Sequence, residues 1–279
     1  MSDHRLPTIS IVTPCLNART TIEKALESVA RQGHHVEHIV IDGGSTDGTV
    51  ELIAQREGVT WISEPDDGLS DAMNKGIAMA SGDLIGWLNA DDWYLPGAFD
   101  AVLRATRSQP GALWVTGQCI IVDGDGQEIR RKVSSYKNFW LRHYSFSRYL
   151  TNNFVSCPAT FIRSGAYRQA GEYRRDHQYS MDYDMFLRVA RLGDPAIVQA
   201  PLATFTMVEG TKSMSGFEMQ FREHFRIARE RGAGHPYSVV VNFVFSTLVI
   251  GVYKSMRFAR RVRRARSVDG GASAKVSAA

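Results

Sequence analysis

The sequence has few cysteines, and none of them form a pair at the spacing of a metal site. The three cysteines, Cys15, Cys119 and Cys157, lie far apart in a chain of 279 residues. An odd number of isolated cysteines argues against a disulfide framework and a zinc centre, and indicates a reducing compartment. The opening residues, MSDHRLPTIS, lack the apolar stretch of a signal peptide. These absences predict a protein of the cytosol or of the cytosolic side of a membrane.

The chain also lacks a strong excess of either charge. Its formal net charge is only +4, and seven Lys and Arg residues fall within residues 254–266. The rest of the sequence is therefore close to neutral, and only this basic end could attract a nucleic acid. We expect no nucleic-acid partner. The length and the 44% hydrophobic content predict one large globular domain, or a domain with an appendage.

Strand-like and helix-like segments alternate through the first hundred residues. The strand-like segments are almost entirely apolar and cover residues 8–13, 37–42, 59–63 and 83–89. Apolar strands separated by helical patterns predict an α/β fold, with a mostly parallel sheet covered on both faces. Beyond residue 112 we expect a hairpin turned at Gly124–Gly126, an irregular stretch at 136–156, a strand at 158–164 and a helix at 181–193.

Polar loops follow each of the four predicted strands. They read TPCLN, DGGSTDG, EPDDG and NADD. Parallel sheets bind their ligands beyond the carboxyl ends of the strands, which lie on one edge. The sequence therefore predicts one site built from these four loops.

Two adjacent carboxylates, Asp91 and Asp92, end the fourth strand. Mg²⁺ and Mn²⁺ take oxygen ligands and commonly bind one or two carboxylates together with substrate phosphates. With no His or Cys nearby, this pair suits a metal that arrives with a diphosphate. The alternative is that one of the two, Asp92 more than Asp91, caps the helix that follows.

The loop VIDGGSTDGT places another acidic residue at a strand end. Asp42 ends the strand, and Gly43 and Gly44 let the backbone turn close to a ligand. A Walker-type loop is excluded because no Gly-Lys-Ser/Thr follows, and an EF-hand is excluded because Asp47 stands where glycine is required. An acidic acceptor for the N–H groups of a base or ribose remains, with a plain turn as the alternative.

Four segments in this order resemble family 2 glycosyltransferases of the GT-A fold, and most closely bacterial enzymes of cell-surface polysaccharide and glycolipid assembly. They are SIVTPCLNA, VIDGGSTDGT, EPDDGLSDAMNKGIAMASGDLIGWLNADD and MDYDMFLRVA. The resemblance covers residues 7–100 and 150–215 and is absent beyond about residue 236. It implies a nucleotide-diphospho-sugar donor (usually a UDP-sugar), Mg²⁺ or Mn²⁺, and inversion at the anomeric carbon.

The resemblance also implies roles for individual residues. Asp42 would hold the base of the donor, and the residues around the nucleotide sugar would be Thr13, Pro14, Asn17, Ser45, Asp66, Asp67, Asn89 and Asp91. Asn89–Asp91 stands for the family's D-x-D, with Asn89 in place of its first aspartate and Asp91 contacting the metal.

Asp182 falls where the family places its catalytic base, and Met181 takes the place of a glutamate. A carboxylate near the acceptor can accept the proton of the attacking hydroxyl. The alternative is that Asp182 caps its own helix. The stretch VEGTKSMSG (208–216) resembles a loop that closes over the diphosphate, but it lacks the metal-binding histidine of many relatives.

The end of the chain is hydrophobic and then basic. Residues 237–253 are apolar apart from four Ser, Thr and Asn residues, and they are short for a membrane span. An interfacial helix with a basic clamp on anionic lipid is expected, with a helix packed on the catalytic domain as the alternative. We divide the chain into a catalytic domain at 1–215, helices at 216–264 and a disordered tail at 265–279. Within the catalytic domain, residues 1–110 would bind the donor and residues 111–215 the acceptor.

Together these observations predict an inverting, metal-dependent glycosyltransferase on the cytoplasmic face of the inner membrane. Its acceptor would be a lipid-linked or membrane-proximal glycan or glycolipid. A nucleotidyltransferase would share the sheet and the acidic site but would show a basic, Gly-rich loop near its first strand. A membrane-docked scaffold on a degenerate transferase fold is permitted by Asn89 and Met181.

Overall fold

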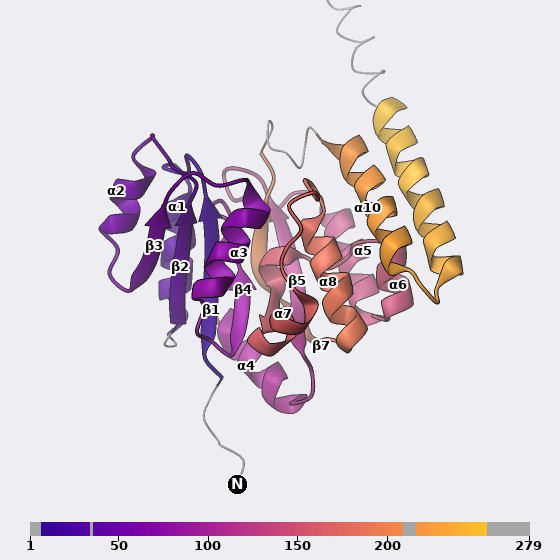
Figure 1. The fold of residues 1–279 in the computed structure, drawn as a ribbon, viewed down its shortest axis with the longest axis horizontal. Coiled ribbons are helices and arrows are strands. Elements are labelled where there is room, and N and C mark those ends of the chain that lie inside the picture. Colours follow the sequence, from indigo (N-terminus) through magenta and orange to yellow (C-terminus); the bar gives the residue numbers. More distant parts are fainter. Residues whose placement is uncertain (1–6, 34–35, 209–215, 256–279) are drawn as a thin grey trace, which may run out of the picture.

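The computed structural model describes residues 7–33, 36–208 and 216–255, and its centre is a seven-stranded sheet (Figure 1). The order of the strands is β3-β2-β1-β4-β6-β5-β7. Their bounds are β1 Ile9–Cys15, β2 Val36–Asp42, β3 Val59–Ser63, β4 Leu84–Trp87, β5 Trp114–Val122, β6 Thr160–Arg163 and β7 Ala196–Thr206.

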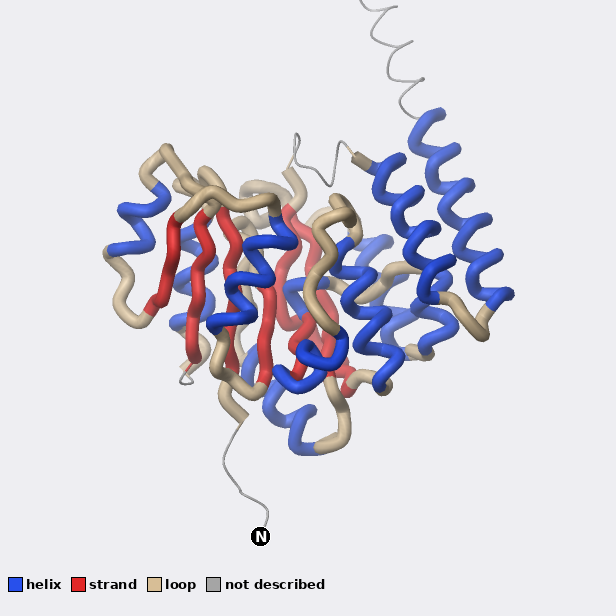
Figure 2. The backbone as a smooth tube through the Cα atoms, in the orientation of Figure 1, coloured by secondary structure: helices blue, strands red, loops and turns tan. Residues whose placement is uncertain are grey.

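The first four strands are parallel, as predicted from their apolar sequences. β1 pairs with both β2 and β4, and β2 pairs with β3. β6 runs antiparallel to β4 and β5, and β7 is parallel to β5. The loops after the parallel strands therefore gather along one edge, at the top of the view in Figure 2.

Helices cover both faces of the sheet. Alternate side chains of a strand point to opposite faces, so Ile11 packs with α1 and α4, whereas Val12 packs with α3, α7 and α8. α3 lies so close to β1 that a Cβ on Gly76 would come within 2.3 Å of Val12 Cγ1. The helices are α1 Ile22–Ala30, α2 Thr49–Ala54, α3 Leu69–Met79, α4 Ala98–Ser108, α5 Arg131–Arg142, α6 Phe146–Thr151, the 3₁₀ turn η1 Cys157–Ala159, α7 Ser164–Ala170, α8 Met181–Leu192 and α10 Phe217–Arg231.

Two predictions for the middle of the chain were wrong. The turn at Gly124–Gly126 exists, but its return consists of a single bridge between Val122 and Glu128. Thr116 of β5 already pairs with β6, so a longer return strand would meet an occupied edge. Arg130 adopts a left-handed φ of 54° and the chain enters α5 instead. The stretch expected to be irregular contains the end of α5 and all of α6. The strand at β6 and the helix at α8 are confirmed.

The chain ends, within the described residues, in an antiparallel pair of helices on the side of the molecule far from β3 (Figure 1). α10 packs beside a second helix, Pro236–Ser255, which we call the C-terminal helix. Three ring contacts join the pair: Phe217–Tyr253 with ring centroids 4.1 Å apart, Phe225–Phe243 at 5.0 Å and Phe221–Phe245 at 6.2 Å.

Candidate functional site

Asp42 anchors the first corner of the sheet edge. Its buried carboxylate accepts hydrogen bonds from Gly44 N at 3.1 Å, Ser45 N at 2.9 Å and Ser63 Oγ at 2.6 Å, and one from Ser45 Oγ. Burial alone would raise the pKa of Asp42, but the bonds from Ser45 and Ser63 outweigh it and hold the pKa below its ordinary value. The carboxylate is thus ionised and held by the turn that it organises.

Asn17 joins the loop after β1 to the loop after β2. Its backbone N donates to Ser45 Oγ at 2.7 Å, and its Oδ1 accepts from Thr46 N at 3.0 Å. Asn17 itself has a left-handed φ of 51°, which Asn tolerates better than most residues. The side chains of Asn17, Asp42 and Ser45 are therefore brought together as predicted.

Thr13 and Pro14 lie inside the sheet, at the end of β1. Thr13 Oγ1 is 2.9 Å from His38 Nε2, and both side chains are buried. Burial lowers the pKa of His38 to about 4, so this imidazole is neutral. The side chains of Thr13 and Pro14 are buried, so only their backbone could border a nucleoside at this corner.

Asp66 and Asp67 lie differently although they are adjacent. Asp66 accepts from Gly68 N at 2.8 Å and lies against Gly43, where an added Cβ would be 2.7 Å from its Oδ2. Gly43 thus lets Asp66 approach the Asp42 turn. Asp67 is exposed and pairs with Arg175 at 3.3 Å, away from that turn.

The second corner is the NADD turn after β4. Asn89 accepts from Trp87 Nε1 at 2.8 Å and donates to Asp92 Oδ2 at 3.0 Å. Asp92 is only 1% exposed, and burial together with the charge of Asp91 raises its pKa well above the ordinary value. Asp92 does not cap α4, whose cap is Gly97.

Thr206, which the sequence did not single out, ties this corner to the far half of the sheet. Its backbone N donates to Asp92 Oδ1 at 2.7 Å, and its Oγ1 donates to the carbonyl oxygen of Asp91 at 2.5 Å. Both carboxylate oxygens of Asp92 are therefore occupied inside the protein. Asp91 is partly exposed, and no hydrogen bond or ion pair joins its carboxylate to another residue in the portion of the chain that the structure describes.

Asp91 is the carboxylate that fits a divalent cation. Burial raises its pKa, so a cation that holds it ionised would offset an unfavourable charge. The described residues contain no group of three His, Cys, Asp or Glu that could hold a metal by themselves. A metal at Asp91 would therefore need oxygen ligands from its substrate, as Mg²⁺ and Mn²⁺ commonly take.

Asp182 lines a cavity of about 460 Å³ beside this corner. Phe205 and Met207, the neighbours of Thr206, line the same cavity, so the end of β7 borders both Asp91 and Asp182. Cys157 also lines it, and its thiol pKa is raised by burial and by the charges of both Asp182 and Asp92. Asp91, Asp92 and Asp182 thus belong to one region.

Burial raises the pKa of Asp182, and its own neighbours oppose that shift. Tyr183 N donates to its Oδ1 at 2.8 Å, and the positive charge of Lys137 acts in the same direction. The N-cap residue of α8 is Ser180, so Asp182 lies in the first turn and is not the cap. A carboxylate with a raised pKa in a cavity is suited to accept a proton.

The segment 10–171 matches the family model described as glycosyl transferase family 2. The chain belongs to glycosyl transferase family 2. An uncharacterized glycosyltransferase of Mycobacterium tuberculosis is 32% identical over 208 residues, which are 71% of this chain and 75% of that relative. Family membership makes this chain a glycosyltransferase and removes the nucleotidyltransferase alternative.

Two solved structures share the fold of this glycosyltransferase. S. aureus TarS 1–349 in complex with UDP-GlcNAc has a TM-score of 0.61 and 16% identity, covering 80% of this chain and 66% of that one. The mannosyltransferase PcManGT of Pyrobaculum calidifontis, in complex with GDP-Man and Mn²⁺, has a TM-score of 0.57 and 15% identity, covering 91% and 81%. At these identities the likeness concerns the fold, and it agrees with the predicted GT-A architecture.

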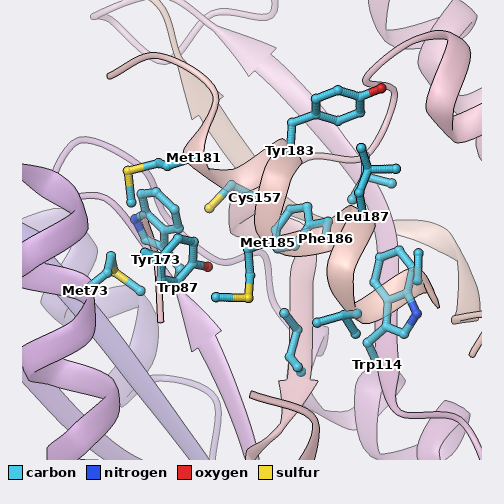
Figure 3. Close-up of a cluster of buried hydrophobic side chains, with 14 of the residues drawn as sticks. Met73, Trp87, Trp114, Cys157, Tyr173, Met181, Tyr183, Met185, Phe186 and Leu187 are labelled. Atoms are coloured by element: carbon cyan, nitrogen blue, oxygen red, sulfur yellow. The ribbon is translucent and has the colours of Figure 1, made fainter. Parts of the chain in front are cut away.

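Two of the departures of this glycosyltransferase from its family pattern, Asn89 and Met181, have structural explanations. Asn89 supplies the amide that satisfies Asp92. Met181 is a core residue beside the rings of Trp87 and Tyr173 (Figure 3), and its sulfur accepts from Ser70 Oγ at 3.1 Å. Of the loop at 208–216 that was expected to close over the diphosphate, residues 209–215 lie outside the described residues, as does the tail at 265–279.

We expect Asp42→Asn to lower the free energy of unfolding by about 2 kcal/mol at pH 7, because the amide would oppose donors that now bond a carboxylate. Since the folded pKa of Asp42 is lowered, its stabilisation is present above the unfolded pKa and is lost as pH falls through the folded value. The difference in unfolding free energy between the wild type and Asp42→Asn should therefore shrink at acid pH. Urea unfolding at pH 7 and at an acid pH measures this difference.

Asp66→Asn is the matched control, because among the described residues its carboxylate accepts a hydrogen bond only from Gly68 N. Its cost should stay below about 1 kcal/mol at pH 7. An Asp42→Asn protein as stable as the control would mean that the turn does not depend on the charge.

Proposed function

We propose that this glycosyltransferase is inverting and metal-dependent, and that it transfers a sugar from a UDP-sugar to a hydroxyl of a lipid-linked or membrane-proximal acceptor. The observation that carries the proposal is the single strand end at Thr206, which borders Asp91 on one side and the Asp182 cavity on the other. The group that binds the departing diphosphate and the group that activates the acceptor hydroxyl must be neighbours, because both act at the same carbon of the donor sugar.

The donor is assigned to the edge formed by the loops after β1, β2, β3 and β4. Ser45 and Asn17 are exposed or partly exposed there, and Asp66 lies against the same turn. The carboxylate of Asp42 already accepts hydrogen bonds from the turn. Asp42 would therefore act in base recognition indirectly, by positioning Ser45 and the backbone of the turn. TarS, which shares the fold, was solved with UDP-GlcNAc, and this agrees with a UDP-sugar donor.

The metal is assigned to Asp91, with Asp92 as the buried residue that holds the turn. A bound Mg²⁺ or Mn²⁺ would supply positive charge to the departing diphosphate. Asp91 would hold that charge in place, and Asn89, Asp92 and Thr206 would keep Asp91 in position.

Asp182 is assigned as the catalytic base. The acceptor oxygen forms a bond to the anomeric carbon while the bond from that carbon to the diphosphate oxygen breaks, and the hydroxyl proton passes to the Asp182 carboxylate. The elevated pKa of Asp182 favours this transfer. One displacement from the opposite face inverts the anomeric centre.

The C-terminal helix is assigned to the membrane surface. It is long enough and apolar enough to cross a membrane by length and composition. Its polar side faces the protein: Asn242 donates to the Leu150 carbonyl oxygen at 3.0 Å, and Ser238 and Ser246 are buried with it. Its apolar side faces outward, with Val244, Leu248 and Val252 between 48% and 64% exposed.

A helix with polar residues inside and apolar residues outside is unfavourable in water and suited to lipid. Because Asn242 fastens it to the catalytic domain, the helix would lie along the bilayer surface with its domain. The basic residues of 254–266 begin at the end of this helix with Lys254, which pairs with Glu218 at 2.9 Å, and the six that follow it in the sequence would bind anionic headgroups. The proposed location is therefore peripheral, on the cytoplasmic face of the inner membrane.

Asp182→Asn should reduce UDP release from the preferred UDP-sugar, measured with Mn²⁺ across a panel of donors, by about a hundredfold or more. Affinity for UDP should stay within about twofold, because Asp182 lines the acceptor cavity and not the nucleotide corner. Retained turnover would refute the assignment of the base. A loss of UDP affinity of the same size would place Asp182 with the donor instead.

Asp91→Asn should weaken the effect of Mn²⁺ on UDP-sugar binding, measured by calorimetry with and without the metal. The wild-type enzyme should bind the donor about tenfold more tightly with Mn²⁺, and the variant should show little difference. Asp67→Asn is a matched control, since Asp67 is an exposed acidic residue paired with Arg175. Equal dependence on Mn²⁺ in wild type and Asp91→Asn would contradict the metal assignment.

Replacing Val244, Leu248 and Val252 together with Gln should release the enzyme from vesicles of phosphatidylcholine mixed with phosphatidylglycerol in a flotation assay. Three exposed apolar side chains elsewhere, Trp61, Phe139 and Leu192, provide a control triple substitution with Gln. The control should stay bound. Equal binding of both triple variants to the vesicles would contradict the assignment of the C-terminal helix as the membrane-binding surface.

A further inference from the structure

A lysine that the proposed mechanism does not use lies in the same cavity as Asp182. Lys137 belongs to α5, and its Nζ donates to Ser156 Oγ at 2.9 Å. An ammonium group carries three donors. Within the residues that the structure describes, no ion pair joins Lys137 to a carboxylate.

The environment of Lys137 disfavours an isolated positive charge. Burial lowers its pKa, although the nearby groups Cys119 and Asp182 act in the opposite direction. Lys137 is partly buried, and an ammonium group removed from water with incomplete hydrogen bonding is costly unless an anion meets it. The cavity is therefore prepared for a negatively charged group beside Asp182.

A second polar group that lines the cavity has a nitrogen atom without a partner in the described part of the chain. His224 of α10 is 6% exposed, and its Nε2 has no hydrogen-bond partner among the described residues. Burial lowers the pKa of His224 to about 4, so its ring is neutral at pH 7. It can form a hydrogen bond but adds no second positive charge beside Lys137. An unmet polar atom with this degree of burial points to a polar ligand.

The rest of the cavity has a mainly apolar side and a side that carries its basic residues. α10 and the C-terminal helix contribute Phe217, Phe221, Phe245, Val249 and Tyr253, together with Gln220. The side formed by α5 and the segment before η1 contributes Lys132, Lys137, Asn152 and Asn153, together with Val133, Tyr136 and Val155. Asp182 lies in the same cavity as both groups, which suits a molecule with an apolar portion and a charged polar portion.

We propose that the acceptor of this glycosyltransferase is an anionic amphiphile, whose carboxylate or phosphate binds Lys137 while its apolar chain lies against α10 and the C-terminal helix. His224 adds a hydrogen bond to the polar portion. The reacting hydroxyl then lies next to the charged group, within reach of Asp182. This inference rests on the proposed function, because it assigns the acceptor of that same site.

The test measures binding of three octyl compounds to the full-length enzyme loaded with UDP and Mn²⁺, each below its micelle-forming concentration. Octyl β-D-glucuronide and octyl phosphate carry a negative charge, and octyl β-D-glucoside carries none. The glucuronide and the glucoside share the octyl chain and the sugar ring and differ only by a carboxylate in place of a hydroxymethyl group, so this pair isolates the charge. Octyl phosphate tests a phosphate on the same chain. We expect at least one anionic probe to bind about tenfold or more tightly than the glucoside. The anionic probe that binds more tightly shows whether the acceptor carries a uronate or a phosphate.

Lys137→Met should abolish this preference, and Lys137→Arg should retain most of it. Arg142→Met removes a positive charge from the same helix at an exposed position outside the cavity, and should retain the preference in full. Equal binding of all three probes by the wild type, a preference that survives Lys137→Met, or an equal loss in Arg142→Met would each overturn the proposal.

A further readout separates acceptor binding from tuning of the base. If Lys137 acted only by keeping Asp182 ionised, Lys137→Met would shift the pH profile of kcat for every acceptor and leave probe binding unchanged, which would also overturn the proposal. Failure of the proposed function is distinct, because it would appear as no UDP release from any UDP-sugar, whereas the probe measurement needs no turnover.

Discussion

The hydrogen bonds of the buried Asp92 carboxylate join the two halves of the site. Asp92 accepts from Thr206 N at the end of β7 and from Asn89 in its own turn. A carboxylate that is 1% exposed is tolerated only when such donors satisfy it. The end of β7 is thereby held against the NADD turn, and with it Phe205 and Met207, which line the Asp182 cavity. The relation between Asp91 and Asp182 depends on this contact.

Local patterns were sufficient to predict the half of the sheet formed by β1 to β4. β1, β2 and β4 are short, mostly apolar segments followed by polar turns, which is typical of buried parallel strands, and parallel pairing places the following loops on one edge. The contact from Asp92 to Thr206 could not be predicted, because it joins residues 114 positions apart and no motif in the sequence marks Thr206. The sequence therefore indicated that Asp91 and Asp92 are a pair, but could not show that one is structural and the other free.

The half of the molecule that carries the Asp182 cavity was less predictable for two physical reasons. α5 is a largely polar helix of which only Ser134 and Leu141 are buried, so few of its residues carry a core signal, and the cavity-lining Lys137 was missed. In the C-terminal helix, Ser238, Asn242 and Ser246 read as interruptions of an apolar segment. They follow one another at intervals of four residues and form the face that packs on the protein. These polar residues face the protein, where Asn242 donates a hydrogen bond to the carbonyl oxygen of Leu150.

This arrangement of the C-terminal helix suggests how the two substrates reach one centre. Phe245 and Val249 line the cavity, whereas Val244 and Leu248, each one position earlier, face outward. One helix therefore forms both a cavity wall and the proposed lipid-facing surface. The donor corner at β1 and β2 lies across the molecule, where its loops are polar and exposed (Figure 1). A water-soluble nucleotide sugar would enter there, and an amphiphilic acceptor would reach Asp182 from the membrane side without its apolar chain crossing water. The strand end at Thr206 is where these two routes meet.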